Sequence, residues 1–262
     1  MEYKLEKSKD GTIKINFLEG YSSVIIPTKD EKKTVCVSCQ IGCCVGCKFC
    51  YSGKVKFKRN LTTEEIIKQV EVAQKIIGKR PQSVVFMGMG EPLLNLSNIL
   101  KAAEAIHNKF SIARYRITIS TSALNNLNKL SKVNFNLAIS LHSPFDSIRK
   151  KLIPSTISIN RIVKFVDSFC KTHKKRFGVM IAYTLIKGVN DSEKDLRKLL
   201  SYKWHKRILF NLVEFNDILS FKKSDDKTIE EFKLGIINKG YKCFIRTARG
   251  RDVKASCGML EG

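Results

Sequence analysis

The chain has 262 residues, of which 43% are hydrophobic and 27% charged, which is ordinary for a globular protein and excludes a wholly disordered chain. It carries 48 Lys and Arg against 24 Asp and Glu, a net charge of +24 at pH 7. A surplus of this size favours an anionic partner, for which RNA, DNA and an anionic membrane surface are the candidates. No apolar run approaches the ~18 residues of a membrane span, and the N-terminal residues contain no signal core. We therefore expect a cytoplasmic protein without membrane attachment.

The chain alternates short β-branched runs with amphipathic stretches after an N-terminal segment of different character. Residues 1–33 predict a small β-hairpin extension, with strands at 3–5, Ile13–Phe17 and 23–26. Residues 34–262 predict one further domain, whose strands are expected at 34–38, 83–87, 116–121, 136–141, 178–185 and 208–215. Helices are expected at 62–77, 96–108, 123–132, 160–171, 191–202 and 227–238, before a last strand at 243–247.

Six strands that alternate with helices predict an α/β fold with a parallel sheet, either open and doubly wound or barrel-like. Ligands of such folds gather at the carboxyl ends of the strands. Polar or glycine-rich residues follow most of the expected strands at that end: a cysteine loop, then residues 88–92, 120–122, 140–142 and 214–216. The sequence therefore predicts one site along this edge of the sheet.

The cysteines carry the sharpest chemical signal. The chain has nine, and six of them fall within fifteen residues, at positions 36, 39, 43, 44, 47 and 50. Without an export signal, clustered thiols indicate metal or redox chemistry rather than structural disulfides. Cys43, Cys47 and Cys50, spaced C-x3-C-x2-C, can hold three corners of a [4Fe–4S] cluster and leave the fourth iron open. The alternative is a zinc site, which needs a fourth ligand from Cys36, Cys39 or Cys44.

The cysteine spacing resembles the signature of the radical S-adenosylmethionine (SAM) enzymes, in which the open iron binds SAM. Gly90 and Glu91, in the run Gly-Met-Gly-Glu-Pro after the second expected strand, resemble the turn of these enzymes that binds the SAM ammonium group. Glycines allow a close backbone approach, and a carboxylate suits a cationic amino group. The resemblance implies a radical-SAM partial (β/α)6 barrel with a [4Fe–4S] cluster.

Longer blocks of sequence resemble the RlmN/Cfr family of RNA adenine methyltransferases, in a short form that lacks most of the N-terminal accessory domain. The blocks are VCVSCQIGC (35–43), FMGMGEPLLN (86–95), ISTS (119–122), AISLHSP (138–144), GVND (188–191) and RGRDVKASCGML (249–260). The resemblance implies that Cys257 takes a methyl group from one SAM and that a second SAM is cleaved to a radical. It also implies a covalent RNA adduct, released as Cys36 forms a disulfide with Cys257.

The resemblance also assigns the remaining site and the partners. Further SAM contacts are implied at Ser120, Ser140, Leu141, His142 and Asn216, beside Gly90 and Glu91. The substrate would be adenine in rRNA or tRNA, methylated at carbon 2 rather than carbon 8, with two SAM per turnover. An electron donor such as flavodoxin or ferredoxin is implied, and we expect a monomer. We expect the positive charge to gather near Cys257 and hold the RNA.

One departure from the family leaves an alternative open. The family has a glutamate, proposed as the base for the adenine hydrogen, where this chain has Ser22 or Ser23, and Glu19 is the nearest carboxylate in the sequence. The chain could therefore be a radical-SAM-fold protein that acts on another substrate or only binds RNA.

Overall fold

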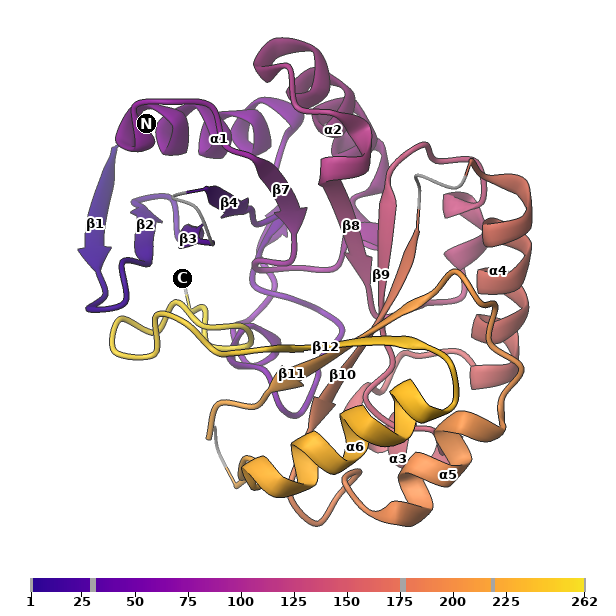
Figure 1. Ribbon diagram of the computed structural model, residues 1–262. Coiled ribbons are helices and arrows are strands. Elements are labelled where there is room, and N and C mark those ends of the chain that lie inside the picture. Colours follow the sequence, from indigo (N-terminus) through magenta and orange to yellow (C-terminus); the bar gives the residue numbers. More distant parts are fainter. Residues whose placement is uncertain (1, 29–31, 175–177, 218–219, 262) are drawn as a thin grey trace. The chain divides into compact units, whose positions relative to one another are not determined.

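The computed structural model describes residues 2–28, 32–174, 178–217 and 220–261 (Figure 1). The chain divides into two compact units. The first comprises Met1–Gly46, Cys50–Ser120 and Arg249–Gly262, and the second comprises Cys47–Phe49 and Thr121–Ala248. The boundary that the sequence suggests after residue 33 stays a prediction.

The first unit begins with an antiparallel meander of β1 (Tyr3–Lys7), β2 (Ile13–Phe17) and β3 (Tyr21–Pro27). The predicted N-terminal β extension is therefore present. Its last strand pairs with β4 (Lys33–Cys36), which places Val24 opposite Cys36. Because β3 and β4 are hydrogen-bonded neighbours, the extension continues the sheet that bears the cysteine loop.

Beyond β4 the sheet of the first unit is parallel. β4 pairs with β7 (Ser83–Phe86), and β7 pairs with β8 (Ile117–Thr121). The connections are α1 (Thr63–Ile77) and α2 (Leu96–Phe110), whose buried residues recur at helical spacing. A capping box of Thr62 and Glu65 opens α1. β5 (Gln40–Ile41) and β6 (Arg59–Asn60) form a small antiparallel ribbon, and the cysteine loop lies between these two strands in the sequence.

The second unit has a parallel sheet in the order β9 (Asn136–Ser140), β10 (Val179–Leu185), β11 (Leu209–Glu214) and β12 (Lys242–Arg246). Its connecting helices are α4 (Ile159–Thr172), α5 (Glu193–Ser201) and α6 (Asp226–Asn238). They lie on one side of this sheet (Figure 1), and aromatic contacts such as Tyr183 with Phe232 of α6 fill the interface. The predicted βα alternation is thus found in both units.

One expected helix is wrong, and one helix of the structure was not expected. The stretch 123–132 forms no α-helix beyond a single 3-10 turn at Leu127–Leu130, because Ala123 has a positive φ of 59° and three asparagines favour turns. A helix that the sequence reading missed, α3 (Asp146–Leu152), follows Pro144. It spans seven residues, too few for a periodic signal.

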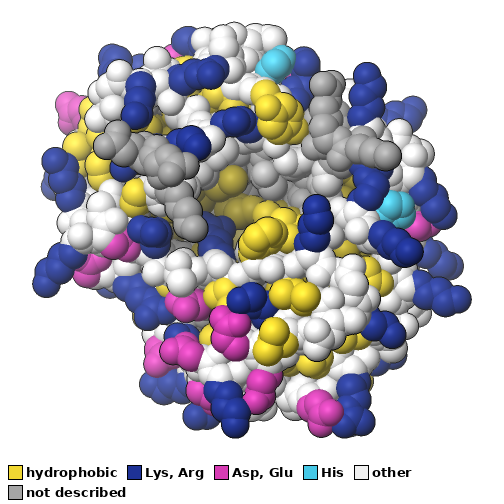
Figure 2. Space-filling model, viewed as in Figure 1, with side chains coloured by type: hydrophobic (Ala, Val, Ile, Leu, Met, Phe, Trp, Pro, Cys, Tyr) yellow, Lys and Arg dark blue, Asp and Glu magenta, His cyan; other side chains and the backbone are white. Residues whose placement is uncertain are grey.

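On the face shown in Figure 2, Lys and Arg side chains are spread widely, and much of the Asp and Glu lies toward the lower left. That positive charge gathers near Cys257 stays a prediction. In the described parts of the chain, no helix is both long and apolar enough to span a membrane.

Candidate functional site

The three cysteines of the C-x3-C-x2-C motif lie on the loop after β5, and each is partly exposed. Cys43 and Cys50 belong to the first unit and Cys47 to the second. Gly42 turns the loop with a φ of +73°, and a Cβ there would lie 2.4 Å from the Lys56 carbonyl oxygen. The loop is therefore held tightly against residues 55 and 56 at its start, while its thiols reach the surface.

Burial opposes ionisation of two of these thiols in the absence of a metal. It raises the pKa of Cys43 to about 12 and, with the nearby Cys257 as a smaller cause, raises the pKa of Cys50. Iron ions would supply the positive charge that keeps both deprotonated. Among the described residues, no three His, Cys, Asp or Glu side chains lie close enough together to hold one metal ion. A [4Fe–4S] cluster binds each cysteine on a different iron, so the three-cysteine loop fits it better.

The Gly-Met-Gly-Glu turn after β7 packs directly on the segment that precedes the cysteine loop. A Cβ on Gly88 would lie 2.5 Å from Ser38 Oγ, and the Ser38 hydroxyl accepts the Met89 N–H at 2.8 Å. Gly90 has a φ of +104°, and a Cβ there would lie 2.7 Å from Gln40 and 2.8 Å from Cys39 Sγ. Only glycine fits both positions, so the backbone itself forms the wall of the site.

Glu91 is the buried acid of this turn, with 2% of its surface exposed. Its N–H donates to the Gln40 side chain at 2.9 Å, and its carboxylate accepts the Leu93 N–H at 3.0 Å. A buried carboxylate is stabilised by the donors that face it, and these hydrogen bonds fix Glu91 within the turn. Its contact with the SAM ammonium group stays a prediction.

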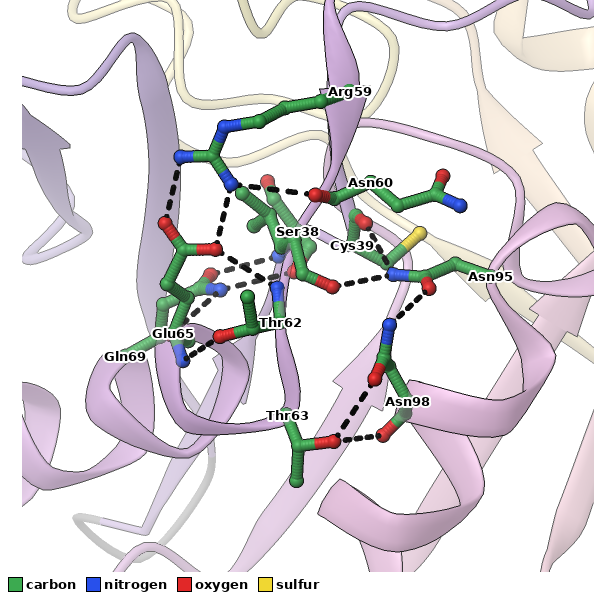
Figure 3. A network of polar contacts seen from close by, with 11 residues as sticks. Ser38, Cys39, Arg59, Asn60, Thr62, Thr63, Glu65, Gln69, Asn95 and Asn98 are labelled. Carbon is green, nitrogen blue, oxygen red and sulfur yellow. Dashed lines mark hydrogen bonds and ion pairs between the residues drawn. The ribbon is translucent and has the colours of Figure 1, made fainter.

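A polar network holds the segment on which this turn packs (Figure 3). Gln69 of α1 exchanges two hydrogen bonds with the Ser38 backbone, at 2.8 and 2.9 Å. Asn95, at the start of α2, donates to the carbonyl oxygens of Cys39 and Leu61, both at 2.8 Å. The network fixes the segment before the cysteine loop to two helices. Asn95 stood inside a recognised block, but nothing in the sequence marked Gln69.

Gly90→Ala tests the close approach. We expect at least a tenfold loss of SAM affinity and a stability loss of about 1–3 kcal/mol, because the new methyl must displace Gln40 or Cys39 at a strained φ. Equilibrium dialysis of SAM against the cluster-loaded protein measures the affinity. Gly78→Ala is the matched control, since Gly78 also has a positive φ but has no atom within 4 Å of its Cβ position. Equal SAM affinity in both variants would contradict the close packing.

The C-terminal segment is fastened beside the cysteine loop. The Tyr51 N–H donates to the Gly258 carbonyl at 2.8 Å, and the Ser52 hydroxyl donates to the Leu260 carbonyl at 2.6 Å. The segment's other end is held by Asp10, whose carboxylate accepts the Gly250 N–H at 2.8 Å. Cys257 lies exposed between these attachments, close enough to Cys50 to act on it electrostatically. The structure thus places the Cys257 segment beside Cys50, and the cluster stays a prediction.

Cys36 is the last residue of β4 and is 6% exposed. It is paired with Val24 of β3 and Val85 of β7 in the same sheet. No disulfide joins any two of the nine cysteines, all of which lie within the described ranges. The disulfide with Cys257 therefore stays a prediction about the reaction.

The serine at the family's acid position connects to a different carboxylate from the one suggested by sequence. Ser22 donates to Asn16 Oδ1 at 2.7 Å, and the Asn16 amide donates to the Glu6 carboxylate. Glu19 is exposed in the turn between β2 and β3, where Phe17 pairs with Tyr21 without a register slip. Ser23 is buried on the opposite face, and its hydroxyl has no hydrogen-bond partner. The carboxylate linked to this position is therefore Glu6.

In the second unit, His142 follows β9 with a positive φ of 54°. Its Nδ1 accepts the Thr184 N–H at 3.0 Å, and its ring packs edge-on against Phe49 at 4.8 Å. Burial, with the nearby Arg149 charge, lowers the pKa of His142 to about 3. The imidazole is therefore neutral at pH 7 and carries its proton on Nε2, available as a donor.

This shift predicts a pH dependence of stability. His142 has a folded pKa of about 3 and an unfolded value near ~6.5, so the unfolded chain binds more protons between these values. Its contribution is complete above pH 6.5 and is lost as the pH falls, by about 2 kcal/mol at pH 5. Urea unfolding of metal-free protein at pH 7.5 and 5 should show this fall, and His142→Gln should reduce it. The same fall in both proteins would refute the assignment.

Arg149 is a site residue that the sequence reading missed. It is fully buried and donates to four carbonyl oxygens at 2.8–3.0 Å, those of Ser122, Ser140, Leu141 and Ile157. Burial lowers the pKa of Arg149 to about 10, so it remains charged at pH 7. Its guanidinium therefore fixes the chain where β9 ends and where the residues after β8 turn. Nothing in the sequence distinguishes Arg149 from Lys150 and Lys151, which follow it in the same short helix.

The remaining predicted SAM contacts differ in accessibility. Ser120 and Ser140 are partly exposed near the carboxyl ends of β8 and β9, whereas Asn216 is 4% exposed just after β11. Leu141 is fully buried, with its N–H bonded to the Ala182 carbonyl and its own carbonyl bonded to Arg149. Both backbone groups of Leu141 are therefore engaged, and its contact with SAM stays a prediction.

Comparisons with known proteins agree on the superfamily. The profile of the Radical SAM superfamily matches residues 37–200. The chain is 37% identical over 251 residues to the probable dual-specificity RNA methyltransferase RlmN of Prochlorococcus marinus (strain NATL2A), covering 91% of this chain and 69% of that protein. It is 38% identical over 273 residues to the dual-specificity RNA methyltransferase RlmN of Buchnera aphidicola subsp. Schizaphis graminum, covering 97% and 75%. A radical SAM methyltransferase structure from Sphaerobacter thermophilus matches with a TM-score of 0.89 at 31% identity, covering 98% of this chain and 80% of that one.

Proposed function

The chain belongs to the Radical SAM superfamily and, within it, to the RlmN family of RNA methyltransferases, and on that premise we propose that it methylates a ring carbon of adenine in RNA. The expected α/β radical-SAM fold is confirmed, and the protein is a SAM-dependent RNA methyltransferase of the radical SAM type. The finer assignment is carbon 2 of adenine, in preference to carbon 8, in rRNA, tRNA or both. The proposed methylation is supported most directly by the attachment of the Cys257 segment to Tyr51 and Ser52, because this attachment places the Cys257 thiol beside the cysteine loop.

The residues present fit the cofactors that the family uses. Cys43, Cys47 and Cys50 would hold three irons of a [4Fe–4S] cluster, and Gly90 and Glu91 would meet the SAM amino group. Ser120, Ser140, Leu141, His142 and Asn216 complete the proposed SAM contacts. When bound, the cluster would supply the one-electron chemistry that cleaves SAM reductively. An electron donor such as flavodoxin or ferredoxin would supply the reduced cluster.

The proposed chemistry uses two SAM per turnover and both reactive thiols. The Cys257 thiolate takes the methyl group of one SAM and releases S-adenosylhomocysteine. The radical from the second SAM removes one hydrogen atom from that methyl group, and the resulting carbon bonds to the adenine. The ring hydrogen would leave as a proton to a group of the protein, and the oxidised cluster would be the acceptor of the remaining electron. The Cys36 thiolate then attacks Cys257 Sγ, the sulfur–carbon bond breaks, and the released carbon takes a proton to become the methyl group.

The net charge and one polar group of the chain support an RNA substrate, which we expect a cytoplasmic monomer to bind. The net charge of +24 favours phosphate contacts, which dominate affinity for nucleic acid. The proton of the adenine ring needs an acceptor, and the hydrogen-bonded group of Ser22, Asn16 and Glu6 lies on the sheet that bears Cys36. The second candidate function is a different substrate, or RNA binding alone, and the serine at the family's acid position favours it.

Expression in a host lacking its own enzyme separates the two functions. We expect a gain of 2-methyladenosine in total RNA, measured by nucleoside mass spectrometry. A gain of 8-methyladenosine alone would overturn the carbon 2 assignment. Cys50→Ala is the control, because it removes a cluster ligand. No methyladenosine with four irons bound per chain would overturn the proposed function in favour of the second candidate.

A further inference from the structure

The sheet of the second unit has one face covered by helices and another that carries an unusual row of side chains. Phe210 of β11 packs against Trp204 and Tyr241, with ring centroids 5.9 and 5.7 Å apart. Since side chains alternate along a strand, Asn211 lies on the opposite face. The register aligns Asn211 with Ala182 of β10 on one side and with Phe244 of β12 on the other.

Phe244 is the first unexplained member of this row. It is 59% exposed, whereas its neighbour Cys243 is 7% exposed on the helix-covered face. An exposed phenylalanine on a strand keeps a large apolar surface in water, at a cost that ordinary packing would remove. Lys242 and Arg246, two positions before and after Phe244, share its face. β12 therefore presents an aromatic ring between two cations, spaced by roughly 7 Å.

Asn211 is the second and independent observation. Its side chain is only 8% exposed, and no described residue forms a hydrogen bond with its amide. Its amide atoms keep some contact with solvent, so a ligand could reach them. In the row, Asn211 lies between the small side chain of Ala182 and the ring of Phe244. The amide therefore has the donor and acceptor that would bind the edge of a planar polar ligand.

The row continues to the proposed SAM contact. Ala182 is aligned with Ser140 of β9, so Ser140, Ala182, Asn211 and Phe244 lie across neighbouring strands on one face. Three strand spacings separate Ser140 from Phe244, about 14 Å. A ligand that stacks on Phe244 would therefore lie on the same sheet face as the cofactor contact, within the length of a nucleotide or two.

We propose that this face is a binding site for an unpaired nucleobase of the RNA substrate, stacked on Phe244 and hydrogen-bonded by Asn211, with Lys242 and Arg246 on the flanking phosphates. The proposal rests on the proposed function, since it takes RNA as the substrate. Stacking on an aromatic ring beside cations is the way proteins hold single-stranded RNA, and an amide can read a base edge. A peptide strand added to the β12 edge would use backbone groups and would not need the Asn211 amide.

Binding of a fluorescein-labelled single-stranded RNA, followed by anisotropy, tests the site without requiring turnover. Phe244→Leu should weaken binding about tenfold with an unchanged salt dependence, because it removes a stacking face and no charge. Lys242→Ala should lower the salt slope by about 0.7, the value for one phosphate contact on a single strand. Leu234→Ala, at a 53% exposed position on α6, is the matched control and should bind as wild type.

Asn211→Leu gives a second readout that a purely structural role would not produce. It should weaken RNA binding several-fold while the thermal unfolding temperature stays the same or rises, because the lost amide had no protein partner. A fall in unfolding temperature with unchanged RNA affinity would overturn the role of Asn211. Unchanged affinity in both Phe244→Leu and Asn211→Leu would overturn the site.

Methylation measured in the same variants distinguishes failure of the proposed base site from failure of the proposed function. If wild type forms methyladenosine and Phe244→Leu has an unchanged KM for RNA, the base site is refuted and the methyltransferase stands. If wild type forms none while Phe244→Leu still weakens RNA binding, the base site stands and the methyltransferase is refuted.

Discussion

Cys257→Ala should abolish RNA methylation, with a fall of at least a thousandfold. The proposed transfer places the methyl carbon on the Cys257 sulfur before it reaches RNA, and alanine offers no atom to carry it. The cluster and the reductive cleavage of SAM should remain, because Cys257 lies outside the C-x3-C-x2-C motif and is exposed. Nucleoside mass spectrometry measures the methylation, and anaerobic assays of iron and 5′-deoxyadenosine measure the rest.

Replacement of Cys36, the second thiol of the proposed mechanism, should have the opposite effect on the covalent bond to RNA. Cys36→Ala should still form the bond between Cys257 and RNA but should fail to break it, so that the protein is purified with covalently attached RNA. The double variant Cys36→Ala with Cys257→Ala should lose the adduct. Cys44→Ala is the matched control, an exposed thiol in the same loop with no assigned role. Methylation that survives in Cys257→Ala, or RNA absent from Cys36→Ala, would refute the two-thiol mechanism.

The sequence predicted the strands well because each is an apolar β-branched run that ends in a polar turn. β8 and β9 begin and end within a residue or two of their predicted limits. The start of α1 was also predictable, since the Thr62 and Glu65 capping box depends only on local spacing. The stretch 123–132 failed for the reverse reason: its apolar residues have helical spacing, but Ala123 and the asparagines prefer turns.

The parts of the candidate site that could be predicted are those whose chemistry depends on a few residues close together in the sequence. The cysteine loop and the Gly-Met-Gly-Glu turn could be named because their spacing within the sequence is itself the geometry. The residues that fix this site in space could not be named. Asn16 connects Ser22 to Glu6 only through strand pairing, and Asn211 lies beside Phe244 only through a parallel register. Such contacts join positions far apart in the chain, which periodicity does not report.

Arg149→Met should cause the largest loss of stability of any single change considered for the second unit, about 3 kcal/mol or more. The variant leaves four buried carbonyl oxygens without the donor that now serves them, since Arg149 is fully buried and bonds to each. Methionine fills much of the volume, so the loss reports the hydrogen bonds rather than a cavity. Urea unfolding gives the free energy, and Arg161→Met, which loses a single exposed hydrogen bond to Asn125, should change it by less than ~0.5 kcal/mol.

Arg149→Lys tests whether the positive charge alone is sufficient or whether the several N–H donors of the guanidinium are needed. A lysine keeps the positive charge but cannot direct donors to four carbonyls in one plane, so stability should remain well below wild type. Because two of those carbonyls belong to Ser122 and Ser140, SAM affinity should fall in the same order as stability, with Arg149→Met below Arg149→Lys. If Arg149→Lys equals wild type in both measurements, the charge alone matters, and the guanidinium does not position the strand ends. A fall in stability with full SAM affinity would instead restrict Arg149 to holding the fold.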